Sequence, residues 1–165
     1  MVKGKGLAIF ALIIGIVGLG LGVYSLVFLQ QQNSGIQKTW FVYDSSVHFT
    51  NPPYTDIPIN EITINFRVKS GESVYGLFNT YATLDDIGEA AISFRFVLDG
   101  FVITSPVSPE VTFISDHLAI GGSVTLQMAT DTILPGLHTM TVSIQGNFLN
   151  NKIEESTLLI QTYLP

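Results

Sequence analysis

The chain of 165 residues contains no cysteine and few charged residues. Without cysteine, thiolate catalysis, disulfide scaffolds, zinc fingers and iron–sulfur clusters are all excluded. Only 12% of the residues are charged, against about 25% in ordinary globular domains. Residues 38–165 hold five basic and thirteen acidic residues, so this segment lacks the basic surface that binding to a nucleic acid requires. The apolar fraction of 47% also excludes a disordered, solvating chain.

The longest stretch without a charge lies between Lys5 and Lys38, and its residues 6–29 form an apolar run. As a helix this run would be about 36 Å long, against about 30 Å for the hydrocarbon core of a bilayer. A cleaved secretory signal has an apolar region of about 7–15 residues and ends in a small-x-small site, which is missing here. The run therefore predicts an uncleaved transmembrane helix. A cleaved signal and a processed pilin-type leader remain the alternatives.

Basic residues set the orientation that we expect for this helix. Lys3 and Lys5 precede it, whereas Lys38 is the only basic residue near its far end. The positive-inside rule therefore places the N-terminus in the cytoplasm and the C-terminal domain outside the cell. We predict a single-pass cell-membrane protein with four parts, namely a cytoplasmic stub (1–5), a transmembrane helix (6–29), a linker (30–39) and an ectodomain (40–165).

Six small residues within the apolar run recur at alternating spacings of three and four. They are Ala8, Ala11, Gly15, Gly18, Gly22 and Ser25. This spacing places them on one stripe of a helix with a repeat of about 3.5 residues. Because small residues let helix backbones approach closely in lipid, the stripe predicts self-association in a left-handed parallel bundle.

The chain from Trp40 onward shows strand patterns and no helical stripe. Apolar and polar residues alternate over residues 62–68, which is typical of a half-buried strand. Asp99-Gly100 separates two apolar runs, and this dipeptide strongly favours a two-residue hairpin turn. Eight or nine short strands with turn residues between them predict an all-β domain, a β-sandwich or jelly roll. Trp40, Phe41 and Tyr43 are expected to open its first strand, with a membrane-interface aromatic belt as the alternative.

Two segments near the C-terminus carry a family resemblance. Residues 134–145 (LPGLHTMTVSIQ) start a strand after a Pro-Gly turn, and residues 155–161 (ESTLLIQ) follow after a loop. They resemble the closing strands of C1q/TNF-like jelly rolls, and residues 97–100 resemble the mid-domain hairpin of that group. The membrane-anchored arrangement is similar to that of small, mostly uncharacterised archaeal surface proteins. The resemblance implies a homotrimer that binds a partner, and it supplies no catalytic residue.

Histidines and carboxylates are the residue types in this chain that could form a catalytic or metal site. His48, His117 and His138 lie far apart and in different predicted strands or loops, so each is expected to be structural. We therefore predict no catalytic residue, no cofactor and no enzyme activity. We predict no metal site. Asp85, Asp86 and Glu89 share one predicted turn and are a weak candidate for Ca²⁺ binding, but a solvated turn is the favoured explanation.

The function expected from these features is that of a cell-surface binding protein, a homotrimer with an extracellular ligand of unknown identity. A pilin-like filament subunit is the alternative, because Lys5-Gly6 resembles a leader-processing site of archaeal pilins. An ecto-hydrolase is a third alternative, supported only by the presence of His and Ser. The 18 charges of residues 38–165 remain few for a domain of this size, which predicts a subunit interface.

Overall fold

The structure is a computed structural model that describes residues 35–50, 53–84, 89–104, 110–116 and 119–165. The expected cytoplasmic stub, the apolar run with its stripe of small residues, and residues 30–34 of the expected linker lie outside the described residues. Within the described ranges, no helix is both long and apolar enough to cross a membrane.

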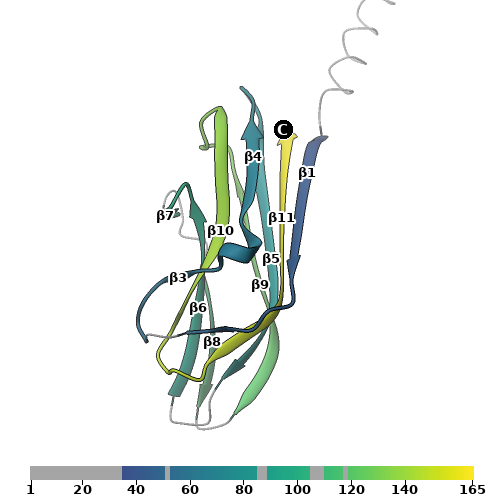
Figure 1. Ribbon diagram of the computed structural model, residues 1–165. Helices are drawn as coiled ribbons and strands as arrows, with labels where there is room; N and C mark the ends of the chain where they lie inside the picture. Colours follow the sequence, from purple (N-terminus) through teal and green to yellow (C-terminus); the bar gives the residue numbers. More distant parts are fainter. Residues whose placement is uncertain (1–34, 51–52, 85–88, 105–109, 117–118) are drawn as a thin grey trace, which may run out of the picture. The chain divides into compact units, whose positions relative to one another are not determined.

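The described residues are almost entirely strands, as the sequence predicts (Figure 1). Strand β1 begins at Gly35, so residues 35–39 of the expected linker belong to a strand, and Trp40, Phe41 and Tyr43 lie within it. The elements in chain order are β1 (Gly35–Asp44), β2 (His48–Phe49), β3 (Ile57–Pro58), the 3-10 helix η1 (Asn60–Ile62), β4 (Ile64–Val68), β5 (Ser73–Leu84), β6 (Glu89–Leu98), β7 (Phe101–Val102), β8 (Glu110–Asp116), β9 (Ile120–Thr130), β10 (Gly136–Gly146) and β11 (Lys152–Leu164).

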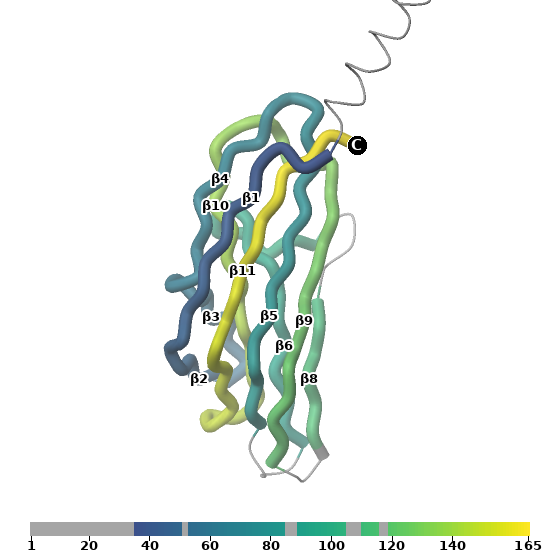
Figure 2. Tube along the Cα trace, turned by 90° about the vertical axis from the view of Figure 1, so that its right-hand side faces the viewer, coloured from purple at the N-terminus to yellow at the C-terminus, as the bar shows by residue number. Residues whose placement is uncertain are grey.

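Two sheets form a sandwich. The first sheet has the order β1-β11-β5-β9, with β2 paired to β11 (Figure 2). The second has β10 and β6 at its centre, with β3 and β4 beside β10, and β7 and β8 beside β6. The long strands therefore follow the orders β1-β11-β5-β9 and β4-β10-β6-β8, which is the arrangement of an eight-stranded jelly roll.

Turn chemistry and alternation explain why these residues form these strands. In β4, buried Ile64, Phe66 and Val68 alternate with exposed residues, as the period of two predicts. Asp99 and Gly100 have φ angles of 51° and 84° and connect β6 to β7. A two-residue turn with two positive φ angles matches the right-handed twist of paired strands, which confirms the predicted hairpin.

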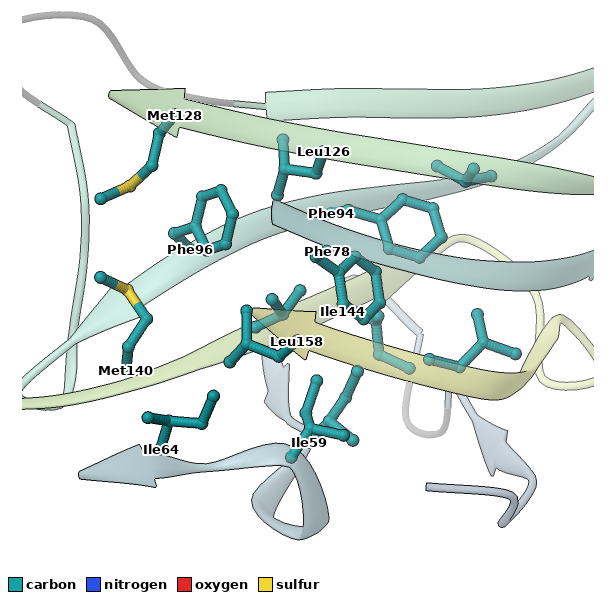
Figure 3. Packing of buried hydrophobic residues seen from close by; sticks show 14 of the residues in the cluster. Ile59, Ile64, Phe78, Phe94, Phe96, Leu126, Met128, Met140, Ile144 and Leu158 are labelled. Atoms are coloured by element: carbon teal, nitrogen blue, oxygen red, sulfur yellow. The ribbon is translucent and has the colours of Figure 1, made fainter. Parts of the chain in front are cut away.

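The core lies between the sheets and is built from the inward residues of both. Phe78 from β5 and Phe94 from β6 are fully buried, with ring centroids 5.9 Å apart (Figure 3). Phe96, Met140 and Leu158 are also fully buried in this layer. Such interlocked aromatic and aliphatic side chains supply most of the hydrophobic stabilisation of a sandwich.

Candidate functional site

The outward surface of the sheet β1-β11-β5-β9 carries few charges. Strands β5 and β9 contain no charged residue, and the charged residues of β11 are confined to residues 152–155 at one end. We call the uncharged outward side chains of these four strands the uncharged face, and Glu154, opposite Tyr81, marks its border. They are Thr39, Phe41, Tyr43, Tyr75, Leu77, Asn79, Tyr81, Ser123, Thr125, Gln127, Ala129, Thr157, Leu159, Gln161 and Tyr163.

Strands β11, β5 and β9 lie side by side (Figure 2), and their register places these side chains in continuous rows across the sheet. Leu77 at the centre lies opposite Leu159 on one side and Gln127 on the other. Phe41 and Tyr43 stay 63% and 55% exposed, so large aromatic side chains meet solvent here. Aromatic residues without charges are typical of the centre of a protein–protein interface.

The outward surface of the second sheet differs in chemistry. Arg95 of β6 forms an ion pair with Asp56 at 3.0 Å, and its strand neighbour opposite is Glu110 of β8. Arg67 of β4 is exposed on the same sheet. Charged residues keep this surface solvated, so the two outer surfaces of the sandwich are suited to different environments.

The turn of the β6–β7 hairpin is held to the start of β10 by His138. Its ring nitrogens Nδ1 and Nε2 lie 2.8 Å from Asp99 Oδ2 and 2.8 Å from the Leu134 carbonyl oxygen, respectively. Both partners only accept hydrogen bonds, so both contacts are hydrogen bonds at once only when the ring is doubly protonated. The Thr139 N–H also donates to Asp99 Oδ1 at 2.8 Å. Asp99 therefore forms the β6–β7 turn and also links this turn to β10 by hydrogen bonds.

Two carboxyl groups beside histidines have lowered pKa values. A hydrogen bond from His48 is the main cause for Asp44. Burial alone would raise the pKa of Asp99, but hydrogen bonds from Thr139 and His138 outweigh it and hold the pKa below its ordinary value of 3.8. Each ionised carboxylate therefore stabilises the folded state at pH values above this ordinary pKa.

We expect the folded state to lose stability as the pH falls below about 4, because a carboxyl with a depressed folded pKa stops stabilising once it is protonated. The variant Asp99→Asn isolates one contribution, since Asn accepts positive φ and Asn-Gly suits the same turn. Thermal unfolding followed by circular dichroism should show Asp99→Asn less stable than the unaltered chain at pH 6. That deficit should shrink towards zero near pH 2, and a deficit of equal size at both pH values would contradict the assignment.

A second histidine, His48, lies between two carboxylates that belong to two other elements. His48 at the start of β2 lies 2.6 Å from Asp44 Oδ2 and 3.9 Å from Glu61 Oε2, which belongs to η1. Sequence reasoning did not single out Asp44 or Glu61. The Asp-x-x-x-His spacing across a Ser-rich corner was the available signal for the first of them, whereas nothing local pointed to Glu61.

The predicted site residues have mixed outcomes. His138 contacts the backbone carbonyl of Leu134, as expected, and also the Asp99 carboxylate, whereas His117 lies outside the described residues. Both ring nitrogens of His48 and of His138 face carboxylates or a carbonyl, so neither ring is positioned to activate a serine. Of the candidate Ca²⁺ ligands, Asp85 and Asp86 lie outside the described residues, and Glu89 is exposed at the start of β6.

No protein-family model and no curated protein matches the sequence. Solved structures with similar folds include the infectious bursal disease virus VP2 subviral particle, at 12% identity over 76% of this chain and 32% of that chain, with a TM-score of 0.49. This chain thus spans about a third of that capsid protein. A pilus protein of Bacillus endospore appendages shares 16% identity, covering 81% of this chain and 94% of that one, with a TM-score of 0.38. The globular domain of zebrafish complement 1qA shares 16% identity over 78% and 97%, with a TM-score of 0.33.

Proposed function

We propose that this protein is a membrane-anchored cell-surface binding protein. Its jelly-roll head forms a homotrimer through the uncharged face. The single observation that carries the proposal is that face, an aromatic, charge-free surface on an otherwise acidic domain. Charge depletion and aromatic enrichment mark the buried centre of interfaces, and homo-oligomer interfaces are more apolar than transient ones.

Charge also favours a second copy as the occupant of this face. Residues 38–165 carry a formal net charge of −8, so identical heads repel one another at most approaches. Contact through the uncharged face brings no like charges together at its centre, and it leaves the charged surface of the second sheet in water. The extracellular ligand would then bind to the solvent-exposed surface of the head outside the uncharged face.

The membrane anchor and the extracellular position of the head are part of this proposal and rest on the apolar run of residues 6–29 with Lys3 and Lys5 before it. The stripe of small residues in that run supports assembly independently of the head.

A pilin-like filament subunit is the second candidate, because the apolar N-terminal run and the Lys5-Gly6 pair are also compatible with a processed leader. The absence of cysteine shows that such a filament would be held together without disulfides. The N-terminal residue of the native protein separates the two candidates, since a pilin would have lost residues 1–5.

We expect the full-length chain, solubilised in detergent, to give a discrete species of three copies in mass photometry and in chemical crosslinking. A strictly monomeric protein at micromolar concentration contradicts self-assembly. Filaments in negative-stain micrographs, together with a native N-terminus at Gly6 or Leu7 in peptide mass spectrometry, would favour the pilin candidate. Protease digestion of the head on intact cells tests the orientation, and a head protected from protease would contradict an extracellular position.

A further inference from the structure

The corner between β1 and β2 brings three potential metal ligands together. Asp44 ends β1, His48 begins β2, and Glu61 lies in η1. One ligand atom from each side chain can be chosen so that all three lie within 4.8 Å of one another. The Asp44 and His48 side chains are mostly buried, at 10% and 18% exposed, whereas Glu61 is 55% exposed and opens the cluster to solvent.

Each of the three side chains is held by its own element. The Ser46 N–H donates to Asp44 Oδ1 at 3.0 Å, which directs the other carboxylate oxygen towards the imidazole. His48 is opposite Ile153 of β11, so its backbone is part of the first sheet. Helix η1 is anchored by Ile62, which is fully buried in the core. The fold therefore holds the backbone of each ligand residue in place, and only the side chains can rotate.

We propose that Asp44, His48 and Glu61 bind a divalent transition-metal ion of the Zn²⁺ class, with water completing the coordination. An ion equidistant from three atoms that are at most 4.8 Å apart lies within about 2.8 Å of each, and Zn²⁺ ligand distances are about 2.0–2.2 Å. Because His48 Nε2 faces Asp44 and Nδ1 faces Glu61, closing the site around an ion requires side-chain movements of about 1 Å and a reorientation of the imidazole that directs one nitrogen at the ion. The hydrogen bond between Asp44 and His48 opens by a similar amount, since tetrahedral ligands about 2.1 Å from an ion are about 3.4 Å apart.

Charge balance favours a cation at this position. Two carboxylates flank one imidazole, and no lysine or arginine in the part of the chain that the structure describes pairs with Asp44 or Glu61. Two ionised carboxylates outweigh the charge of one imidazole in either of its protonation states, so the cluster has a net negative charge. One imidazole nitrogen with two carboxylate oxygens is a donor set suited to Zn²⁺, whereas Ca²⁺ requires six to eight oxygen ligands.

The bound ion would connect the end of β1 to η1. Strand β1 is the outer strand of the sheet that carries the uncharged face, and it pairs only with β11 in the described sheet order. Fixing its last residue to η1 restrains this edge of the head. The site thus has a structural role, and it does not depend on whether the head assembles.

The test is a titration of the untagged, full-length chain in detergent with ZnSO₄ by isothermal titration calorimetry, and with CoCl₂ by visible absorption. We expect one equivalent of Zn²⁺ per chain at pH 7.5, weaker binding at pH 5.5 because protons compete for the imidazole, and no binding of Ca²⁺ at the same concentration. His48→Gln and Glu61→Gln should each weaken Zn²⁺ binding by at least the roughly 10- to 100-fold typical of losing an outer-shell partner.

His138→Gln is the matched control, because His138 also pairs with an aspartate but its second nitrogen faces a carbonyl. It should leave Zn²⁺ binding unchanged. Glu61→Gln keeps the test decisive if His48→Gln does not fold, since Glu61 is exposed and its replacement leaves the core intact. The proposal is overturned if the unaltered chain binds no Zn²⁺ or Co²⁺, or if Glu61→Gln and His138→Gln bind the ions as tightly as the unaltered chain.

Discussion

Replacing Leu77 by lysine is expected to weaken the proposed association of heads through the uncharged face while the head stays folded. Leu77 lies at the centre of the uncharged face, between Leu159 and Gln127. An uncompensated charge buried in an interface costs about 3–5 kcal/mol. Since about 1.4 kcal/mol is a factor of ten, the association constant should fall by more than 100-fold.

The head should tolerate this change because Leu77 is only half-buried in the single chain, and a lysine stem can lie along the sheet with its ammonium group in water. Mass photometry of the detergent-solubilised full-length protein measures the assembly, and circular dichroism measures the fold. Thr112→Lys is the matched control, because Thr112 is exposed on β8 in the second sheet. If Leu77→Lys assembles as the unaltered chain does, the uncharged face is not the interface.

Replacing the next residue, Phe78, by alanine is expected to have the opposite effect and damage the fold itself. Phe78 is fully buried and packs against Phe94 at a centroid distance of 5.9 Å (Figure 3). Truncating a buried phenylalanine costs about 3–5 kcal/mol, through lost burial and the cavity that remains. That is a large part of the 5–15 kcal/mol that typically stabilises a domain, so the Tm should fall on the order of 10 °C or more.

Phe101→Ala is the matched control for Phe78→Ala, since Phe101 is 78% exposed at the start of β7. Its substitution should change the free energy of unfolding by no more than about 0.5 kcal/mol. Urea unfolding followed by intrinsic fluorescence gives both values. Equal destabilisation by the two variants would contradict the burial of Phe78 in the core and the exposure of Phe101.

The neighbours Leu77 and Phe78 also show what sequence reasoning could reach. Alternation in β5 placed consecutive residues on opposite faces, because successive side chains of a strand point to opposite sides. The segment VYGLFNTYAT is apolar on both faces, so its pattern did not reveal which face is inside. Pairing with β11 and β9, and packing against β6, put Phe78 in the core and left Tyr75, Leu77 and Tyr81 on the uncharged face.

The histidine clusters show the same limit over longer distances. His138 and Asp99 are 39 residues apart and meet because β10 pairs with β6 next to the hairpin turn. Asp44, His48 and Glu61 meet because η1 packs beside the β1–β2 corner. No local pattern encodes such contacts, so sequence spacing alone cannot identify the carboxylate partners of His48 and His138.

The sequence by itself determined the all-β class of residues 40–165, most strand positions and the Asp99-Gly100 hairpin, because these depend on backbone stereochemistry and on a residue's nearest neighbours. It also determined the scarcity of charge in this segment. The tertiary structure alone decided that charge would be scarce on one outer surface and present on the other, and that two carboxylates would flank His48. Those outcomes depend on which strands pair across the sandwich, and strand pairing is selected by the packing of the whole core.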